Sequence, residues 1–209
     1  MLLADRQIRE EVAAGSIRID PFEPGHVQPA GIDVRLGREF QVMTAGVEPI
    51  DPREDSTWAW EPVTVPEGQS FTLRPGPFAI SMLRPAAFVL ATTFEHLTLP
   101  RNVVARVEGR SSLARLGLVT HATAGFIDPG FTGHVTFELS NAGARPLLLW
   151  PGMRVAQLAF QSMTGEAERP YGSAGLQSHY QGQRGPTLSR IHERFDYGLP
   201  PIHPERTAA

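Results

Sequence analysis

Apolar and polar residues alternate along several short stretches of this chain, and this pattern predicts strands with one buried face. The strand-like runs are 32–42, 71–73, 78–80, 135–139, 147–150 and 155–160. Twenty glycines and nineteen prolines interrupt them at short intervals, as expected for turns between strands. We therefore expect an all-β domain, a distorted jelly-roll or β-barrel with a short N-terminal helix and few other helical turns.

Residues 4–14 form the best helix candidate. Ile8 and Val12 repeat on one face, Asp5 is placed to cap the first turn, and Gly15 is placed to end the helix. Asp5 and Arg9 are four residues apart, which favours an ion pair on the helix surface.

Two segments depart from the strand pattern. Residues 45–69 are rich in Pro, Glu and Asp, and we expect them to leave the sheet as an excursion. From about residue 166 the apolar periodicity ends, and 166–190 is polar, aromatic and rich in glycine. This segment is either a disordered tail or a lid that orders over a ligand. The expected organisation is a β-domain over 1–165, a lid over 166–190 and an extension over 191–209.

Composition narrows the function classes. Nineteen basic and 22 acidic residues give a formal charge of −3, so no general attraction to nucleic acid is expected. The chain has no cysteine, which excludes disulfides and thiolate zinc sites. No apolar run approaches the length of a membrane span or a signal peptide, so we expect a cytoplasmic protein without a membrane partner.

The stretch 107–118 concentrates groups that bind anions. Arg110 and Arg115 bracket Ser111 and Ser112, and either serine is placed to cap a short helix whose first amides point outward. The alternative is a capped surface turn with two solvated arginines, and the string alone favours that alternative.

Two separated carboxylates follow this stretch. Glu138 lies on the polar face of a predicted strand, beside Thr136 and Ser140, where it faces either water or a polar pocket in which it could act as a general base. Asp128 precedes Pro129 and either forms a turn or accepts a hydrogen bond from a sugar hydroxyl. The sequence lacks an H-x-E motif with P-C-x-x-C, so it lacks the signature of the zinc deaminases.

Together these residues identify a resemblance. The sequence resembles the dCTP deaminase branch of the dUTPase-like superfamily over nearly its whole length, most specifically between residues 109 and 141. The flanking strings that match are Met1-Leu2-Leu3-Ala4-Asp5-Arg6, Ile32-Asp33-Val34-Arg35-Leu36-Gly37 and Tyr180-Gln181-Gly182-Gln183-Arg184-Gly185-Pro186. The resemblance implies a dUTPase-like β-fold and an enzyme of pyrimidine deoxynucleotide biosynthesis.

The resemblance also assigns roles. Glu138 matches the glutamate that activates water for attack at cytosine C4, and Ser111 and Arg115 match the residues that hold that water and the glutamate. Asp128 matches the aspartate near the deoxyribose 3′-hydroxyl, which also makes it a candidate for activating water at the α-phosphate. The implied substrate contacts are Arg110, Ser112, Leu113, Ala114, Asp128, Thr136, Phe137, Gln157, Tyr171, His179 and Gln183. Arg110 and His179 stand where lysine is common in the family.

Further expectations concern the reaction and the partners. Gly125 and Phe126 are similar to the bifunctional branch, which converts dCTP to dUMP, ammonia and diphosphate; its monofunctional relatives release dUTP. The resemblance implies Mg²⁺ bound through the triphosphate rather than by a protein metal site, no zinc, inhibition by dTTP, and a homotrimer. The alternatives are a monofunctional dCTP deaminase, a dUTPase without deaminase activity, and a non-catalytic trimer with the same fold.

Overall fold

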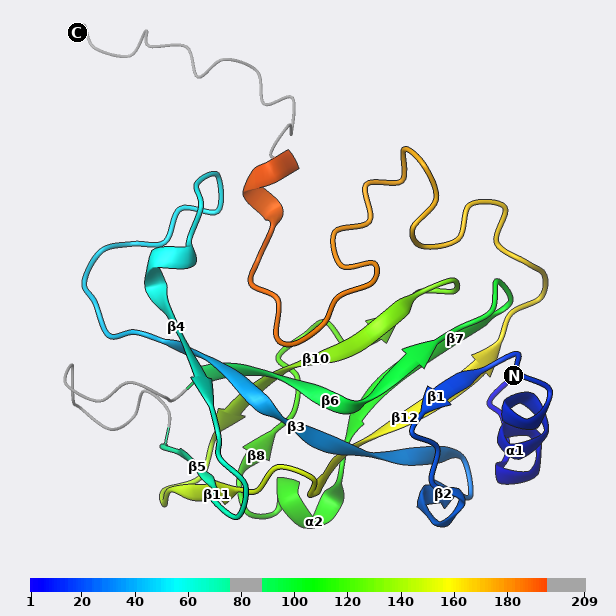
Figure 1. Ribbon diagram of the computed structural model, residues 1–209, viewed down its shortest axis with the longest axis horizontal. Helices are drawn as coiled ribbons and strands as arrows, with labels where there is room; N and C mark the ends of the chain where they lie inside the picture. The colour runs from blue at the N-terminus through cyan, green and yellow to red at the C-terminus, as the bar shows by residue number, and fades with distance from the viewer. Residues whose placement is uncertain (76–87, 195–209) are drawn as a thin grey trace, which may run out of the picture.

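The computed structural model describes residues 1–75 and 88–194 (Figure 1). The strand expected over 78–80 and most of the expected extension, residues 195–209, lie outside the described residues.

A curled ten-stranded sheet forms most of the molecule. Its main path runs β8-β10-β6-β3-β12-β7-β9, with β1 paired to β6 and both β2 and β4 paired to β3. A separate two-stranded sheet joins β5 to β11. The bounds are β1 Arg18–Asp20, β2 Val27–Gln28, β3 Gly31–Met43, β4 Trp60–Thr64, β5 Phe71–Leu73, β6 Phe88–Thr98, β7 Val103–Gly109, β8 Leu118–Val119, β9 Phe126–Ile127, β10 Thr132–Asn141, β11 Leu147–Leu149 and β12 Arg154–Ser162.

The long strand β3 connects the two halves of this sheet. Its first residues, 31–35, pair with β2 and β12, whereas residues 36–43 pair with β4 and β6. The register shifts between Leu36 and Phe40, and such an irregularity bends a strand and increases its twist. Gly37 lies at this bend, where a Cβ would stand 3.1 Å from Thr92 Oγ1. The all-β expectation is confirmed, and the bend explains how one sheet curls around its own core.

Large side chains from both halves fill the interior. Phe40, Phe137 and Phe160 come from three different strands and are at most 1 % exposed. Burial of a side chain of this size stabilises the fold by about 2 kcal/mol. Along β10 buried and partly exposed residues alternate without a break, as the sequence pattern predicts.

The N-terminal helix is confirmed, but its expected cap is wrong. Helix α1 spans Asp5–Ala13, and the N-cap is Ala4, whose N–H donates to Gln7 Oε1 at 3.0 Å. The surface ion pair joins Arg6 to Glu10 at 3.5 Å instead of Asp5 to Arg9. Gly15 follows the helix with φ = 72°, a conformation that glycine adopts at little cost.

Two further expectations need correction. Within the expected excursion over 45–69, a short 3-10 helix η2 (Thr57–Ala59) leads into β4, which joins the main sheet against β3. The run 147–150 is apolar at every position, which is typical of a strand buried on both faces, but Leu148 and Trp150 are 54 % and 47 % exposed. Residues 147–149 form β11 in the small β5–β11 sheet, in which Leu149 is buried and Leu148 is exposed, and Trp150 follows the strand.

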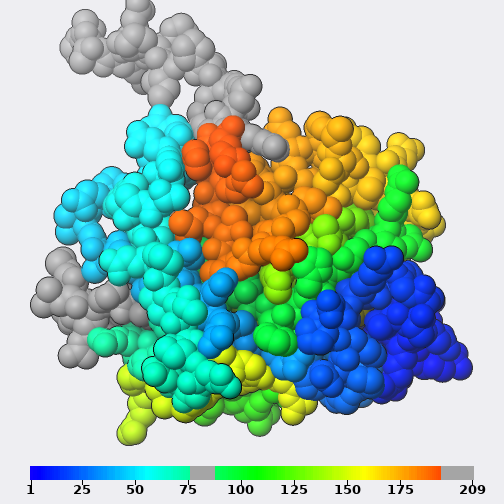
Figure 2. Space-filling view, in the orientation of Figure 1, coloured from blue at the N-terminus to red at the C-terminus, as the bar shows by residue number. Residues whose placement is uncertain are grey.

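The segment 166–190 forms no helix or strand, yet it packs closely against the sheet. Gly182 N–H donates to Thr132 O at 2.8 Å, and Gln183 exchanges backbone and side-chain hydrogen bonds with His134. Figure 2 shows this orange segment over the centre of the visible face, beside the cyan residues of β4. The last described element is the 3-10 helix η3 (Ile191–Arg194). No helix among the described residues is long and apolar enough to span a membrane.

Candidate active site

A cavity of about 460 Å³ lies between the sheet and the segment 166–190. Strands β6 and β10 form its floor, residues 124–131 form one wall, and the C-terminal segment closes it from above. Its lining residues are Trp60, Phe88, Leu90, Ala124, Phe126, Ile127, Asp128, Phe131, Val135, Thr136, Glu138, Tyr171, Tyr180, Gln183, Thr187 and Ser189. Apolar and aromatic walls with a few polar groups are typical of a small-molecule site.

Glu138 is one of two carboxylates in this lining. The alternation along β10 buries Phe137 in the core and turns Thr136 and Glu138 to the other face, toward the cavity. Glu138 Oε2 accepts a hydrogen bond from the Ala122 N–H at 2.8 Å. The carboxylate is therefore held in one orientation at the cavity wall, as a general base must be.

Two polar atoms at the cavity have no hydrogen-bond partner among the described residues. Thr136 Oγ1 and Gln183 Oε1 are both buried, and both residues line the cavity. The Gln183 amide nitrogen donates to His134 O at 2.6 Å, which fixes the side chain. Because buried polar atoms are normally paired, these two oxygens are available to form hydrogen bonds with a ligand or with water.

Aromatic side chains hold the C-terminal segment over the cavity. Tyr171 packs against Phe131 with ring centroids 5.9 Å apart, and its hydroxyl accepts the Tyr180 N–H at 3.0 Å. Burial raises the pKa of the Tyr171 hydroxyl above its usual value, so the group stays protonated and available as a donor. The segment 166–190 therefore packs against the sheet over the cavity.

Asp128 and Gly125 lie on the wall formed by residues 124–131. The Asp128 side chain is exposed at the cavity, and its backbone carbonyl, rather than its carboxylate, accepts the Phe131 N–H of the following turn. Gly125 is buried, and a Cβ there would stand 3.0 Å from His121 Cε1 and 3.1 Å from Val107 O. A larger residue at position 125 would therefore displace this wall.

A second group of expected site residues lies around helix α2 (Ser111–Ala114). Arg110 is the N-cap of this helix, and neither Ser111 nor Ser112 caps it with a side chain, contrary to expectation. Ser111, Ser112 and Arg115 are exposed. Their side chains are therefore available to another molecule rather than used within the helix.

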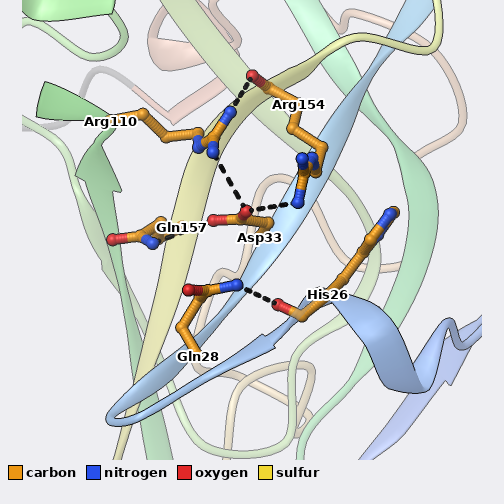
Figure 3. A network of polar contacts seen from close by, with 6 residues as sticks. All are labelled: His26, Gln28, Asp33, Arg110, Arg154 and Gln157. Atoms are coloured by element: carbon orange, nitrogen blue, oxygen red, sulfur yellow. Dashed lines mark hydrogen bonds and ion pairs between the residues drawn. The ribbon is translucent and has the colours of Figure 1, made fainter. Parts of the chain in front are cut away.

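Figure 3 shows the polar network to which Arg110 belongs. Arg110 Nη2 lies 3.2 Å from Asp33 Oδ2, and Arg154 Nη1 lies 3.1 Å from the same oxygen. The Gln157 amide donates to Asp33 Oδ1 at 2.8 Å. Arg110 and Gln157, both expected as substrate contacts, are thus brought together by strands β3, β7 and β12.

The structure therefore divides the expected site residues into two groups. Glu138, Asp128, Thr136, Tyr171 and Gln183 share the cavity. Arg110, Ser111, Ser112, Leu113, Ala114, Arg115 and Gln157 do not line it. In Figure 1, α2 and the orange C-terminal segment lie at opposite sides of the sheet. One copy of the chain does not bring the two groups into one pocket.

The remaining expected residues occupy intermediate positions. His179 lines a neighbouring cavity together with Asp128 and Tyr171. The side chain of Phe137 is fully buried, so only its backbone is placed to meet a ligand. Within the described ranges, no group of three or more His, Asp or Glu side chains is arranged to hold a metal ion.

Sequence reasoning assigned no role to Asp33 or Arg154. An aspartate flanked by Ile32 and Val34 in an apolar strand is a signal of a buried, paired carboxylate. Its partners lie more than 70 residues away along the chain, so the pairing itself emerges only from the fold.

Comparison with known proteins gives a consistent result. A family model described as dCTP deaminase-like matches residues 2–163. A protein of Beutenbergia cavernae named "dCTP deaminase, dUMP-forming" is 52% identical over 196 residues, covering 93% of this chain and 97% of that protein. A Streptomyces griseus subsp. griseus protein of the same name is 52% identical over 197 residues, covering 93% of this chain and 97% of that protein.

A solved structure supports the fold. The crystal structure of a 2′-deoxycytidine 5′-triphosphate deaminase from Agrobacterium tumefaciens superimposes with a TM-score of 0.57 at 24% identity. The match covers 77% of this chain and 47% of the other, so this chain spans about half the length of that protein. The family model covers well over half of the sequence, and relatives about half identical cover nearly all of it, so the chain belongs to the dCTP deaminase-like family.

Proposed function

We propose that the protein is a bifunctional enzyme that converts dCTP and two water molecules to dUMP, ammonia and diphosphate. The observation that carries the proposal is Glu138, held by the Ala122 N–H at the wall of a cavity that also contains Asp128. Relatives about half identical over nearly their whole length carry the name of this activity, which supports the assignment.

Deamination needs a base that can return its proton. Glu138 takes a proton from water while the oxygen adds to C4 of cytosine, and a tetrahedral centre forms. Glu138 passes this proton to N3 and then moves the hydroxyl proton to the amino group, and the carbon–nitrogen bond breaks so that ammonia leaves as the C4 carbonyl forms. Ser111 and Arg115 are proposed to hold the water and the carboxylate, since a hydroxyl can donate or accept and a guanidinium favours the charged base.

The second reaction breaks the triphosphate. Asp128 is proposed to orient a water for attack on the α-phosphorus, and diphosphate leaves as the α–β phosphorus–oxygen bond breaks. Mg²⁺ carried by the triphosphate would supply positive charge that favours departure of the diphosphate, and the protein itself would not need to hold the ion. The exposed carboxylate of Asp128 in the same cavity as Glu138 supports two reactions on one bound nucleotide.

The base and the sugar are proposed to lie in the cavity. Backbone groups of Thr136 and Phe137 read the cytosine edge, and the unpaired oxygens of Thr136 and Gln183 supply further contacts. Tyr171 and Gln183 then close the segment 166–190 over the nucleotide. dTTP has a related base and the same triphosphate, so we expect it to compete for this cavity and to inhibit the enzyme.

The separation of the two residue groups supports assembly of several copies. We propose a homotrimer in which α2 and Arg110 of one copy complete the cavity of its neighbour. Closed cyclic symmetry would build each such site from the same two surfaces. Exposed Ser111, Ser112 and Arg115 are consistent with side chains that find their partners across an interface.

Product analysis tests the activity. Purified protein is incubated with dCTP and Mg²⁺, and dUTP, dUMP, ammonia and diphosphate are separated and quantified over time. We expect dUMP, ammonia and diphosphate in equal amounts. Accumulated dUTP without dUMP would reduce the assignment to a monofunctional deaminase, and hydrolysis of added dUTP without ammonia from dCTP would indicate a dUTPase. Activity should also survive a zinc-selective chelator when Mg²⁺ is resupplied.

A further inference from the structure

Asp33 is a carboxylate with no solvent exposure at the centre of a four-residue network (Figure 3). Its Oδ2 faces the guanidinium groups of Arg110 at 3.2 Å and Arg154 at 3.1 Å, and its Oδ1 accepts the Gln157 amide at 2.8 Å. Arg110 Nη1 also donates to the backbone carbonyl of Arg154 at 3.1 Å. Both oxygens of the buried carboxylate are therefore paired, and the two arginines are tied to each other as well as to Asp33.

Strand register and a bulge create this network. Gln157 on β12 lies opposite Asp33 on β3, so their side chains occupy the same face of the sheet. The pairing of β12 with β3 shifts between Arg154 and Ala156. Residues three apart on a regular strand point to opposite faces, and the irregularity brings Arg154 to the face of Gln157. Gly109, next to Arg110, pairs with Ala156 and completes the arrangement from β7.

The charges of Asp33, Arg110 and Arg154 do not cancel. One buried carboxylate faces two guanidinium groups, which leaves a net positive charge on the network. The Arg110 side chain is 26% exposed and the Arg154 side chain is 42% exposed, so both arginines reach the surface from a buried anchor. Each guanidinium has five N–H donors, and the contacts described use two from Arg110 and one from Arg154.

The neighbouring charges leave this surface positive. Glu108 lies opposite Gln157 on β7, but its carboxylate is 3.5 Å from Arg106 Nε. His26 and Gln28 border the network from the other side (Figure 3), where the Gln28 amide contacts the His26 carbonyl at 3.4 Å. Paired guanidinium groups on a fixed support are suited to phosphate oxygens because their fork geometry allows bidentate bonds.

We propose that Arg154 binds the triphosphate beside Arg110, and that Asp33 is a positioning residue that holds both arginines as one clamp. The inference rests on the proposed function for the identity of the anion, a nucleoside triphosphate. The clamp is assembled before the ligand arrives, so little side-chain freedom is lost when phosphate oxygens replace water on the remaining donors.

The first test uses Arg154 because its side chain is partly exposed and its replacement preserves the core. Arg154→Gln and Arg154→Lys are compared with Arg145→Gln, an exposed arginine on the turn after β10. Calorimetry measures the binding of dCTP, deoxycytidine and inorganic triphosphate in a background that carries both Glu138→Gln and Asp128→Asn, so that neither deamination nor triphosphate cleavage consumes dCTP. We expect Arg154→Gln to weaken the binding of dCTP and of inorganic triphosphate by about tenfold and to leave the binding of deoxycytidine unchanged. Arg154→Lys should recover part of the loss, and Arg145→Gln should match its parent.

Equal binding of dCTP and inorganic triphosphate by Arg154→Gln and its parent would overturn the inference. Equal losses of affinity for deoxycytidine and for dCTP would also overturn the inference, since they would indicate a general structural defect. The native protein could release no ammonia from dCTP while Arg154→Gln still binds inorganic triphosphate more weakly than its parent. That result would support the clamp and contradict the proposed function. The two failures are therefore distinguishable.

The positioning role of Asp33 is tested with Asp33→Asn. Its amide keeps one acceptor oxygen but loses the charge that holds the two arginines. With the otherwise native enzyme, we expect the KM for dCTP to rise by about tenfold, with a smaller change in kcat. A kcat loss with unchanged KM would contradict a role in phosphate positioning. Circular dichroism establishes that the variant folds, and if it does not, the Arg154 series decides the proposal alone.

Discussion

The cavity beneath the C-terminal segment and the Asp33 network differ in how they treat polar groups. In the cavity, Thr136 and Gln183 each keep a buried oxygen unpaired, and Glu138 holds a single backbone hydrogen bond. In the network, both oxygens of Asp33 are paired and two arginines are already in place. The first region leaves contacts for a ligand to complete, whereas the second presents fixed charge. This contrast matches the two ends of dCTP, a base with specific edges and a highly charged triphosphate.

The residues expected to act at the cavity also differ in where they lie on one copy of the chain. The cavity is formed by β6, β10, residues 124–131 and the C-terminal segment of the same copy. The α2 residues that should act at the cavity lie elsewhere on that copy, exposed to solvent. The comparison therefore predicts that variants in the cavity affect chemistry, variants in the network affect triphosphate binding, and variants in α2 depend on the neighbouring copy.

The largest effect is expected for Glu138→Gln. The amide keeps the size of the side chain but cannot accept the proton of water, so ammonia release should fall by about a thousandfold or more. Binding of dCTP, measured by calorimetry, should stay within a few-fold of the native value. The matched control is Glu10→Gln on helix α1. Undiminished ammonia release by Glu138→Gln would remove this residue from the mechanism.

A large and selective effect is expected for Asp128→Asn. If Asp128 orients the water that attacks the α-phosphorus, diphosphate release should fall by about a hundredfold, and dUTP should accumulate. Ammonia release should fall less, because Glu138 remains. Both products are quantified in one reaction mixture. A proportional loss of the two products would show that Asp128 serves binding alone.

A smaller effect is expected for Gly125→Ala. The added Cβ would approach His121 Cε1 to 3.0 Å and Val107 O to 3.1 Å, so the wall that carries Asp128 must shift. We expect the ratio of dUMP to dUTP among the products to fall severalfold, with ammonia release largely kept. Gly165→Ala is the control, since a Cβ there has no neighbour within 4 Å. An unchanged product ratio would exclude position 125 as a determinant of the second reaction.

The smallest effect concerns pH and the support of the C-terminal segment. His96 packs edge-on against His134, whose backbone binds Gln183. Burial first, and then the nearby His134 and Arg184, lower the pKa of His96 below its usual 6.5. The unfolded chain therefore binds a proton on His96 that the folded protein does not, and stability falls as the pH drops below 6.5 toward the folded pKa.

Replacement of His96 by Gln should reduce this pH dependence. Urea unfolding between about pH 5 and about pH 8 gives the free energy of unfolding of both proteins. The native protein should lose more stability than His96→Gln on the acid side of this range. If the free energy of unfolding changes with pH in the same way for both proteins, His96 does not contribute to the pH dependence of stability.

The sequence predicted the features that depend on local periodicity. The alternation along β10 placed Glu138 opposite the buried Phe137, and Gly15 marked the end of α1 correctly. The cap residues were wrong because capping depends on geometry within one turn, which composition does not determine: Arg110 rather than Ser111 is the N-cap of α2.

The features that the sequence did not predict depend on pairing between distant residues. β4 was missed because Pro62 and two exposed residues hide its edge-strand pairing with β3. The Asp33 network was missed because Arg110 and Arg154 approach Asp33 only after β3, β7 and β12 have paired in register. Resemblance supplied the roles of Ser111 and Arg115, but the structure shows that these residues do not reach the cavity of their own copy.

Subunit complementation distinguishes an active site formed by α2 of one copy and the cavity of another from a site within a single copy. Glu138→Gln and Arg115→Gln are each expected to be inactive when pure. The two variants are unfolded together and refolded as mixed assemblies, whose formation is verified by mass spectrometry, and ammonia release from dCTP is then measured. With a shared site, activity should reappear on mixing, because some sites then combine an intact Glu138 with an intact Arg115 from different copies. Mixed assemblies that remain as inactive as the pure variants would contradict a shared site.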